Sequence, residues 1–144
     1  MSQARPTVLV VAAVIVEHGR VLVTQRMPGS HLAGAWEFPG GKVEQDEDPR
    51  DALVRELREE LGVEVEVGAI LDVAFHRYPG KSVLILFYEA HRRPGSPAPA
   101  VIDVAALQWR TGAELVDQDF PPADASILAT VRRLLEGEAV PASP

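Results

Sequence analysis

Two kinds of hydrophobic pattern divide this chain into strand-like and helix-like segments. A continuous β-branched apolar run in residues 8–16 predicts a strand buried on both faces, and residues 20–26 alternate as in a strand with one face on the core. Alternation in residues 64–75 and an apolar run in residues 82–90 predict two longer strands. Residues 106–109 are expected to form a last, short strand.

Turn-forming residues separate these strands. Residues 17–20 have a hairpin turn signal, and breaks follow at residues 27–30 and 78–81 because both stretches contain the pair Pro-Gly. Gly68 is expected to form a bulge or turn inside the third strand. Residues 91–100 are rich in Pro, Gly and small side chains, which predicts a surface loop.

A helix is predicted for residues 51–61, DALVRELREEL, which are almost all good helix formers. Asp48 or Glu47 can cap its start, Pro49 suits the first turn, and Gly62 is a natural stop. The residues expected to face a core are Ala52, Leu53, Leu57 and Leu61.

A second, amphipathic helix is predicted for residues 123–136, packed against the sheet. Arg132 and Arg133 are expected on the side opposite its apolar face. That face is expected to consist of Ile127, Val131, Leu134 and Leu135. About five strands mixed with two substantial helices indicate an α/β fold.

Length and charge restrict the remaining interpretations. A chain of 144 residues is expected to form one domain, with a core over about residues 8–135 and loose ends at 1–6 and 137–144. The net charge of −7 argues against binding to a nucleic-acid polymer. The absence of cysteine excludes disulfides, thiolate zinc sites and cysteine nucleophiles, and fits a cytoplasmic protein. Residues 7–16 are apolar but too short to span a membrane, and a buried strand explains them better than a signal peptide.

Three carboxylates occupy one face of the first predicted helix, because Glu56, Glu59 and Glu60 stand at positions i, i+3 and i+4. Like charges at this spacing repel each other, and a bound hard cation would offset the repulsion. Mg²⁺ prefers oxygen ligands and often combines a few carboxylates with substrate phosphates. A solvated acidic face is the alternative explanation.

The spacing of residues around this helix resembles the Nudix box, G-x5-E-x7-R-E-U-x-E-E-x-G-U, where U is a bulky aliphatic residue. The match holds at every specified position: Gly41, Glu47, Arg55, Glu56, Leu57, Glu59, Glu60, Gly62 and Val63. The resemblance implies the Nudix fold, a mixed sheet between helices, over about residues 8–135. It also implies metal-dependent hydrolysis of a nucleoside diphosphate linked to another group.

Carried over position by position, the resemblance implies that Mg²⁺, with Mn²⁺ as a substitute, is held by Glu56, Glu59, Glu60 and the Gly40 carbonyl. Arg55 is then expected to orient Glu47 through a charge-assisted pair.

The chain resembles MutT-type members of the family in the loop before the last strand. At the position of Asp103 those members have a glutamate that binds metal or acts as the general base. A solvated loop aspartate is the alternative. Without Asp103, Glu59 or Glu60 would have to activate the water.

The stretch before the box also resembles the MutT-type subgroup, which implies nucleotide contacts for Arg26, His31 and Phe38. For His31 an ordinary surface position is the alternative, and aromatic side chains here can equally close a core edge. Lys42 and Tyr78 are further candidate substrate contacts.

Residues 119–124, DFPPAD, resemble the MutT-type base-recognition segment, in which asparagine usually follows Pro-Pro-Ala. Here that position is Asp124. Ionised, it accepts hydrogen bonds from guanine N1–H and the amino group, or from the cytosine N4 amino group; protonated, it also donates. The CTP pyrophosphohydrolases of the subgroup resemble this chain at this aspartate and in residues 36–38. A helix cap is the alternative role for Asp124.

The resemblance therefore implies a nucleoside triphosphate pyrophosphohydrolase that releases a nucleoside monophosphate and pyrophosphate. An oxidised purine such as 8-oxo-dGTP is the favoured substrate, as in sanitation of the nucleotide pool, and CTP or a modified dCTP is second. ADP-ribose or dinucleoside polyphosphate hydrolysis is a further alternative. A non-catalytic nucleotide sensor is disfavoured because no box residue is lost. The expected partner is a small nucleotide rather than a polymer or membrane, and the sequence does not determine the oligomeric state.

Overall fold

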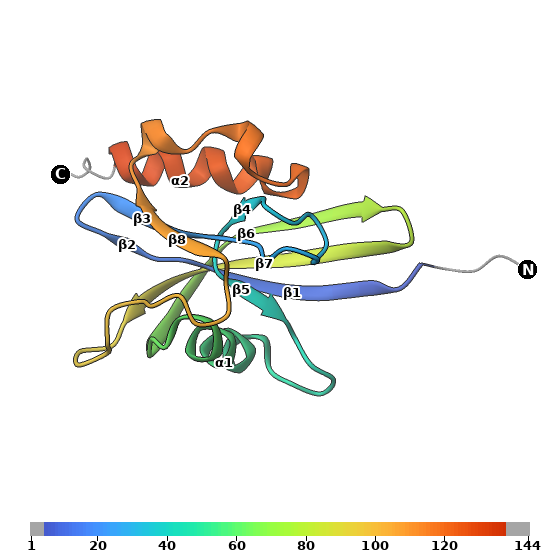
Figure 1. The fold of residues 1–144 in the computed structure, drawn as a ribbon, viewed down its shortest axis with the longest axis horizontal. Coiled ribbons are helices and arrows are strands. Elements are labelled where there is room, and N and C mark those ends of the chain that lie inside the picture. Colours follow the sequence, from blue (N-terminus) through green and yellow to red (C-terminus); the bar gives the residue numbers. More distant parts are fainter. Residues whose placement is uncertain (1–4, 138–144) are drawn as a thin grey trace, which may run out of the picture.

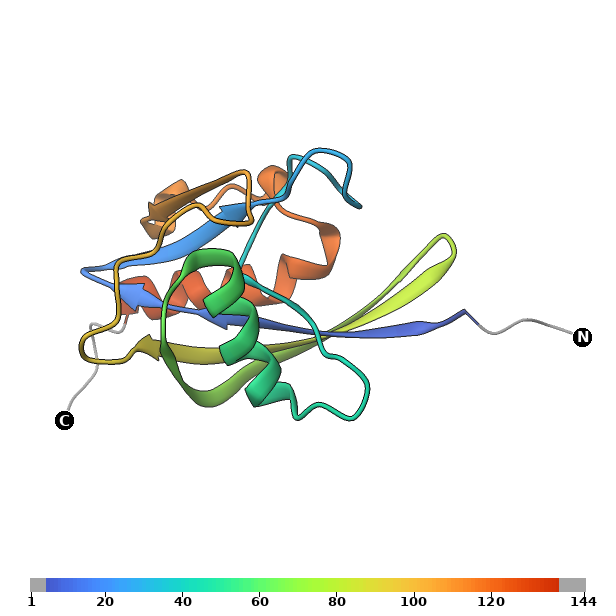
Figure 2. The ribbon, with the colours of Figure 1, turned by 60° about the horizontal axis from the view of Figure 1, so that its bottom comes forward.

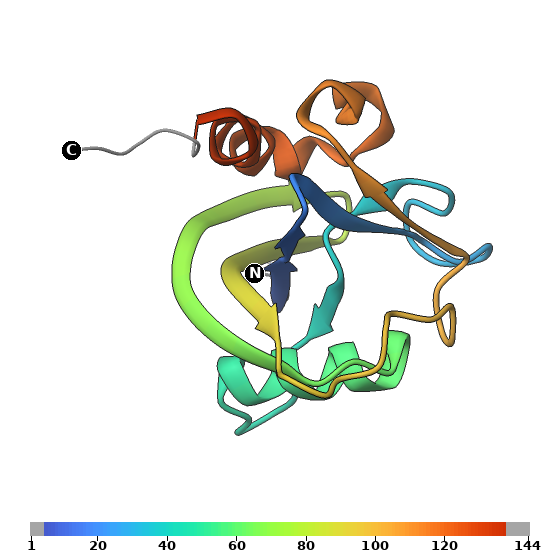
Figure 3. The same cartoon turned by 90° about the vertical axis from the view of Figure 1, so that its left-hand side faces the viewer.

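The computed structural model describes residues 5–137, in which two sheets lie between two helices (Figure 1; Figure 3). The first sheet has the strand order β5-β1-β7-β6, and the second contains β2, β3, β4 and β8. The strands of the first sheet are β1 (Thr7–Val14), β5 (Gly40–Lys42), β6 (Val65–Tyr78) and β7 (Lys81–Arg92). The second sheet is made of β2 (Val16–Glu17), β3 (Arg20–Gln25), β4 (Trp36–Glu37) and β8 (Ala106–Arg110).

Helix α1 (Pro49–Leu61) covers one side of the sheets and α2 (Ala125–Gly137) covers the other (Figure 3). Three short 3₁₀ turns lead into α2: η1 (Gly112–Glu114), η2 (Asp117–Asp119) and η3 (Pro122–Asp124). The first sheet is mixed, because β1 runs parallel to β7 and antiparallel to β5. The α/β fold with a mixed sheet between helices is therefore confirmed. No helix of the described residues is long and apolar enough to cross a membrane.

The second half of β1 is buried on both faces, as its continuous apolar run predicts. Val11 and Ala13 pack into the core under α1, and Ala12 and Val14 pack into the core under α2. Successive side chains of a strand point to opposite faces, so an uninterrupted apolar run is needed where both faces are covered. β1 thus separates two hydrophobic cores.

The strands β6 and β7 are longer than their hydrophobic patterns predict and form a hairpin that projects from the body (Figure 2). The prediction of a loop from residue 91 is wrong for His91 and Arg92, which pair with Glu66 and Val65 in β6. Arg92 is held by two contacts of 2.7 Å to the Glu17 carboxylate. The irregularity expected at Gly68 is present, because the register shifts between Val67 and Ile70.

Helix α1 has the boundaries that its local signals predict. The Asp48 carboxylate accepts a hydrogen bond from the Arg50 amide at 2.7 Å, and Pro49 begins the helix. Gly62 ends the helix in the left-handed conformation, with φ of 71°, and its amide donates to the Arg58 carbonyl. The buried residues of the helix are Ala52, Leu53, Leu57 and Leu61.

Helix α2 differs from its prediction in three respects. It begins at Ala125, because residues 122–124 form a 3₁₀ turn instead. Leu134 is 37% exposed and does not belong to the buried face, which includes Leu128 instead. Arg132 does not simply face solvent, since it donates to the Leu115 carbonyl and to Asp117. Of the ends expected to be loose, 1–6 and 137–144, residues 1–4 and 138–144 lie outside the described residues, and Gly137 is the last residue of α2.

The strand β5 consists of Gly40, Gly41 and Lys42, which strand propensity would not select. Its pairing with β1 sets Gly40 opposite Ala12 and Lys42 opposite Val10. A Cβ atom on Gly40 would lie 1.9 Å from the Val11 carbonyl oxygen. Only glycine allows the two strands to approach this closely.

Replacing Gly40 by Ala is therefore expected to lower the free energy of unfolding by about 3 kcal/mol or more, because the clash is with backbone in a paired strand. Urea denaturation of the purified variant measures this change. Gly112→Ala is the control, since a Cβ there meets nothing closer than 3.9 Å. Equal stability of the two variants would contradict this account of β5.

Candidate active site

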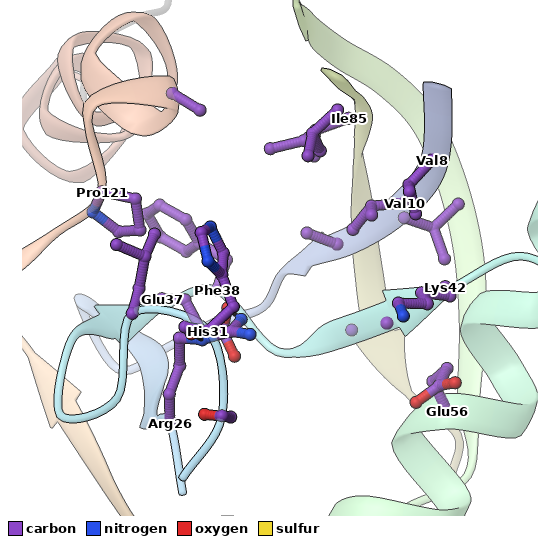
Figure 4. Close-up of a pocket in the computed structure, with 18 of the residues that line it drawn as sticks. Val8, Val10, Arg26, His31, Glu37, Phe38, Lys42, Glu56, Ile85 and Pro121 are labelled. Atoms are coloured by element: carbon purple, nitrogen blue, oxygen red, sulfur yellow. Dashed lines mark hydrogen bonds and ion pairs between the residues drawn. The ribbon is translucent and has the colours of Figure 1, made fainter. Parts of the chain in front are cut away.

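A cavity of about 700 Å³ opens between the first sheet, β4–β5, α1 and the segment before α2 (Figure 4). One wall is apolar and includes Val8, Val10 and Ile85 from β1 and β7. Glu56 and Lys42 lie toward one end, and Pro121 with Glu37 lies across the space from the apolar wall. The cavity thus has an acidic end near α1 and a second polar region near β4.

The acidic end brings together Glu56 and Glu60 of α1 with Asp103. The loop before β8 is docked on the end of α1, because the Asp103 and Ile102 amides donate to the Glu60 carbonyl at 3.1 and 3.2 Å. Burial, followed by the charge of Glu56, raises the pKa of Glu60 well above its ordinary value. Burial also raises the pKa of Glu56. Carboxylates packed this closely repel each other and favour a cation between them.

Arg55 holds this end together. Its Nε and Nη2 donate to the two carboxylate oxygens of Glu47 at 2.8 and 3.0 Å, which is the contact that the sequence leads us to expect. Its Nη1 donates to Glu56 at 3.0 Å, and its Nη2 also donates to the Lys42 carbonyl at 3.1 Å. The Arg55 hydrogen bond lowers the pKa of Glu47 to about 2. A planar guanidinium with several partners fixes their relative positions better than a point charge would.

Glu59 differs from the other two glutamates of its helix face. Its side chain is 57% exposed, it contacts Arg55 at 3.2 Å, and it is not part of the cavity wall. No three acidic or histidine side chains of residues 5–137 converge as a complete metal site. Glu59 therefore lies outside the cavity that Glu56 and Glu60 line, although Arg55 Nη1 contacts both Glu59 and Glu56.

The donor set at the acidic end nevertheless suits a hard divalent cation. Mg²⁺ commonly binds one or two carboxylates and completes its shell with water and substrate phosphates. Glu56 and Glu60 supply such carboxylates, and Gly40 is also part of the cavity wall. A Cβ on Gly41 would fall 2.3 Å from the Glu56 carboxylate, so the glycine leaves that group its space.

At the second polar region, Asp124 is only 4% exposed. Burial, followed by the charge of Glu37, raises the pKa of Asp124 to about 7, and Arg26 acts in the opposite direction. Arg26 donates to Glu37 at 2.8 Å and to the His31 carbonyl. Asp124 directly precedes Ala125, the first residue of α2, and it also lines the cavity, so a capping position and a cavity position coincide at this residue.

His31 and Tyr78 close the cavity at the tip of the projecting hairpin. Their rings meet edge to face with centroids 4.7 Å apart, and both line the cavity. Burial, and then the charge of Asp124, raises the pKa of Tyr78. Burial, and then the positive charge of Lys81, lowers the pKa of His31. His31 is exposed, as the surface alternative expects, but it also contacts Tyr78 and lines the cavity.

Phe38 borders the cavity, but its side chain belongs mainly to the core. It is 2% exposed, and its ring is stacked on Phe120 with centroids 5.7 Å apart. Phe87 meets it edge to face at 6.2 Å. The face covered by Phe120 is not available for stacking on a nucleobase.

Glu37 is a cavity residue that was not among the candidates from the sequence. The signal was present, because a lone acidic residue between Trp36 and Phe38 is unusual in an otherwise apolar phrase. The apolar wall was also missed. Its residues look like ordinary core residues in the sequence, and only the arrangement of β1 and β7 shows that they face open space.

Comparison with known proteins agrees with this geometry. The family model of the NUDIX domain matches residues 4–131. The chain is 44% identical over 132 residues to "Putative 8-oxo-dGTP diphosphatase 2" of Mycobacterium tuberculosis, covering 91% of this chain and 92% of that protein. It is 42% identical over 119 residues to the CTP pyrophosphohydrolase of Escherichia coli, covering 83% and 87% of the two chains.

Solved structures show the same arrangement. The solution structure of the E. coli ORF135 protein has a TM-score of 0.76 and 36% identity, and the match covers 96% of both chains. A MutT NUDIX hydrolase from Burkholderia pseudomallei has a TM-score of 0.77 and 31% identity, over 87% of this chain and 98% of the other. With the Nudix box residues at one end of its cavity, the chain belongs to the Nudix hydrolase family and is MutT-like.

Proposed function

We propose that this protein hydrolyses nucleoside triphosphates to a nucleoside monophosphate and pyrophosphate with the help of a divalent metal. The observation that supports this most directly is one cavity that joins a carboxylate cluster to a polar pair, the partly buried Glu37 and the buried Asp124. A triphosphate needs positive charge at the first region, and a base needs hydrogen-bonding groups at the second. Relatives named as 8-oxo-dGTP diphosphatase and CTP pyrophosphohydrolase act on substrates of this kind.

Glu56, Glu60 and the Gly40 carbonyl would hold Mg²⁺, or Mn²⁺ in its place, and Glu59 would join them if its side chain turned away from Arg55. A bound metal would polarise phosphoryl oxygens and make a bound water more acidic. Arg55 and Glu47 keep Glu56 in position, because Arg55 contacts both carboxylates.

Asp103 lines the cavity beside Glu60, and we assign it the proton of the attacking water. The water oxygen forms a bond to the α- or β-phosphorus as the P–O bond between that phosphorus and the α–β bridging oxygen breaks. The bridging oxygen leaves with pyrophosphate after attack at the α-phosphorus, or with the nucleoside monophosphate after attack at the β-phosphorus. Lys42, on β5 in the cavity wall, neutralises part of the negative charge of the triphosphate.

For the base, 8-oxo-dGTP or another oxidised purine nucleotide is the first candidate, and CTP or a modified dCTP is the second. With its pKa of about 7, Asp124 is present in both protonation states near neutral pH. A protonated carboxyl donates one hydrogen bond and accepts another, as the N1–H and O6 of guanine require. A protonated carboxyl can equally donate to N3 of cytosine and accept from its amino group, so CTP or a modified dCTP remains the second candidate. An oxidised purine substrate would place the enzyme in sanitation of the cytoplasmic nucleotide pool.

The kcat/KM for pyrophosphate release tests this proposal when it is measured with Mg²⁺ on 8-oxo-dGTP, dGTP, CTP and dCTP, with ADP-ribose hydrolysis followed in parallel. We expect 8-oxo-dGTP to exceed dGTP by at least about tenfold through a hydrogen bond to N7–H or O8, the two groups that dGTP lacks, since a well-placed hydrogen-bonding group gives discrimination of this order or more. A preference for cytidine nucleotides would replace the first candidate by the second. A preference for ADP-ribose would overturn the assignment of a triphosphate substrate.

A further inference from the structure

A buried guanidinium lies outside the cavity, at the end of β8. Arg110 is 8% exposed and stands opposite Val21 of β3. It is not part of the cavity wall. A buried charge is costly unless its partners are well placed, so the contacts of Arg110 show what the residue holds in position.

Arg110 connects two segments that are far apart in the sequence. Its Nη1 donates to the Asp119 carboxylate at 3.0 Å and to the Glu114 carbonyl at 3.4 Å. Its Nε donates to Gln108 at 3.0 Å. The guanidinium carbon Cζ lies over the Trp36 ring, 4.6 Å from the ring centroid. The side chain therefore joins Trp36 on β4 to Asp119 at the end of η2.

Each of these two segments leads directly to one of the acidic groups in the cavity. Trp36 precedes Glu37 on β4, and Asp119 is followed by Phe120, two prolines, Ala123 and Asp124. The prolines restrict the backbone between Asp119 and Asp124. A second connection runs in parallel, since Phe120 is stacked on Phe38. Arg110 thus links the segment that carries Glu37 to the segment that carries Asp124.

We propose that Arg110 is a positioning residue, which sets the separation of Glu37 and Asp124 and thereby the choice of nucleobase. This inference rests on the proposed function, in which those two groups recognise the base. Hydrogen bonds weaken steeply outside their normal range of distance and angle, so a small shift between the two segments changes recognition. A displacement of about 1 Å from a remote mutation lowers catalytic efficiency by up to about a hundredfold.

The Arg110→Lys variant tests the inference. Lysine keeps the positive charge but lacks the planar fork, and it cannot both stack on Trp36 and bond Asp119 in the same geometry. We compare kcat/KM for the preferred nucleotide with kcat/KM for a nucleoside triphosphate that carries another base. The ratio of the two values is expected to fall about tenfold, mostly because KM for the preferred nucleotide rises. The kcat for the preferred nucleotide is expected to stay within about threefold, because the carboxylate end is not touched.

Arg132→Lys is the matched control. Arg132 also ties down the segment before α2, through Leu115 and Asp117 at 2.6 Å each, but it contacts neither Trp36 nor Asp119. It is expected to leave the base preference unchanged. Asp119→Asn is expected to reproduce part of the loss of base preference expected for Arg110→Lys. It weakens the ion pair between Arg110 and Asp119 by changing the more exposed of the two partners. Thermal unfolding of all three variants shows that they are folded at the assay temperature.

Loss of base preference in Arg110→Lys and Asp119→Asn, with the preference intact in Arg132→Lys, supports the inference. An Arg110→Lys variant that selects its base as well as the wild type overturns it, as does an equal loss in Arg132→Lys. A wild type that turns over no nucleotide of the panel removes the proposed function and this inference with it. Failure of the inference about Arg110 alone is therefore distinguishable from failure of the proposed function together with that inference.

Discussion

Replacing Glu56 by Gln is expected to lower kcat for nucleotide hydrolysis by at least about a hundredfold. Glutamine keeps the size of the side chain and removes its negative charge, and a metal ion that stabilises charge in the transition state contributes several kcal/mol. Glu56 lines the cavity and accepts a hydrogen bond from Arg55 at 3.0 Å. Initial rates of pyrophosphate release at saturating nucleotide and Mg²⁺ measure the change.

Glu44→Gln is the control for this experiment. Glu44 lies at the rim of the same cavity, its side chain is 70% exposed, and it approaches Arg55 only to 3.9 Å. Exposed ion pairs of this kind contribute little, so its kcat is expected to stay within about twofold of the wild type. If Glu56→Gln retained more than about a tenth of the activity while remaining folded, the assigned role of Glu56 would be wrong.

Replacing Asp124 by Asn is expected to stabilise the protein at pH 8 and to change its stability little at pH 4. In the folded protein burial and Glu37 raise the pKa of Asp124 from 3.8 to about 7. Below pH 3.8 the folded and unfolded states are both protonated, so the group has no effect. As pH rises from 3.8 to 7 the unfolded state loses its proton first, which favours unfolding.

The full penalty above pH 7 is on the order of 4 kcal/mol, the energy equivalent of this pKa difference. Asn has no proton to lose, so the variant avoids the penalty. Urea denaturation at pH 4 and pH 8 measures it, with Asp117→Asn as control because the Asp117 side chain is 72% exposed. A stability difference between Asp124→Asn and the wild type that is the same at both pH values would show that Asp124 is not held in its protonated form.

Local signals account for the parts of the fold that the sequence predicts accurately. The boundaries of α1 follow from Asp48 and Pro49 at its start and Gly62 at its end. Each of these residues acts only on the neighbouring turn of the helix. The strand β5 was not predicted, because its Gly-Gly-Lys sequence has no strand pattern and forms a strand only through pairing with β1. The exposure of Leu134 in α2 likewise depends on which neighbours cover the helix, and its spacing along the chain does not show this.

The same distinction applies to the site. The contact between Arg55 and Glu47 could be expected from the motif, since both groups belong to one continuous stretch of chain. Glu37 and Asp124 are 87 positions apart in the sequence, and their common cavity depends on how β4 and η3 meet. The raised pKa of Asp124 is a consequence of this tertiary arrangement, so the sequence shows the aspartate without its protonation state.

The products formed from a nucleoside triphosphate test the central proposal most directly. Phosphorus NMR of the reaction with Mg²⁺ is expected to show nucleoside monophosphate and pyrophosphate in equal amounts, and a chelator is expected to stop the reaction. Release of nucleoside diphosphate and inorganic phosphate, or turnover that continues unchanged with the chelator, would contradict a metal-dependent pyrophosphohydrolase.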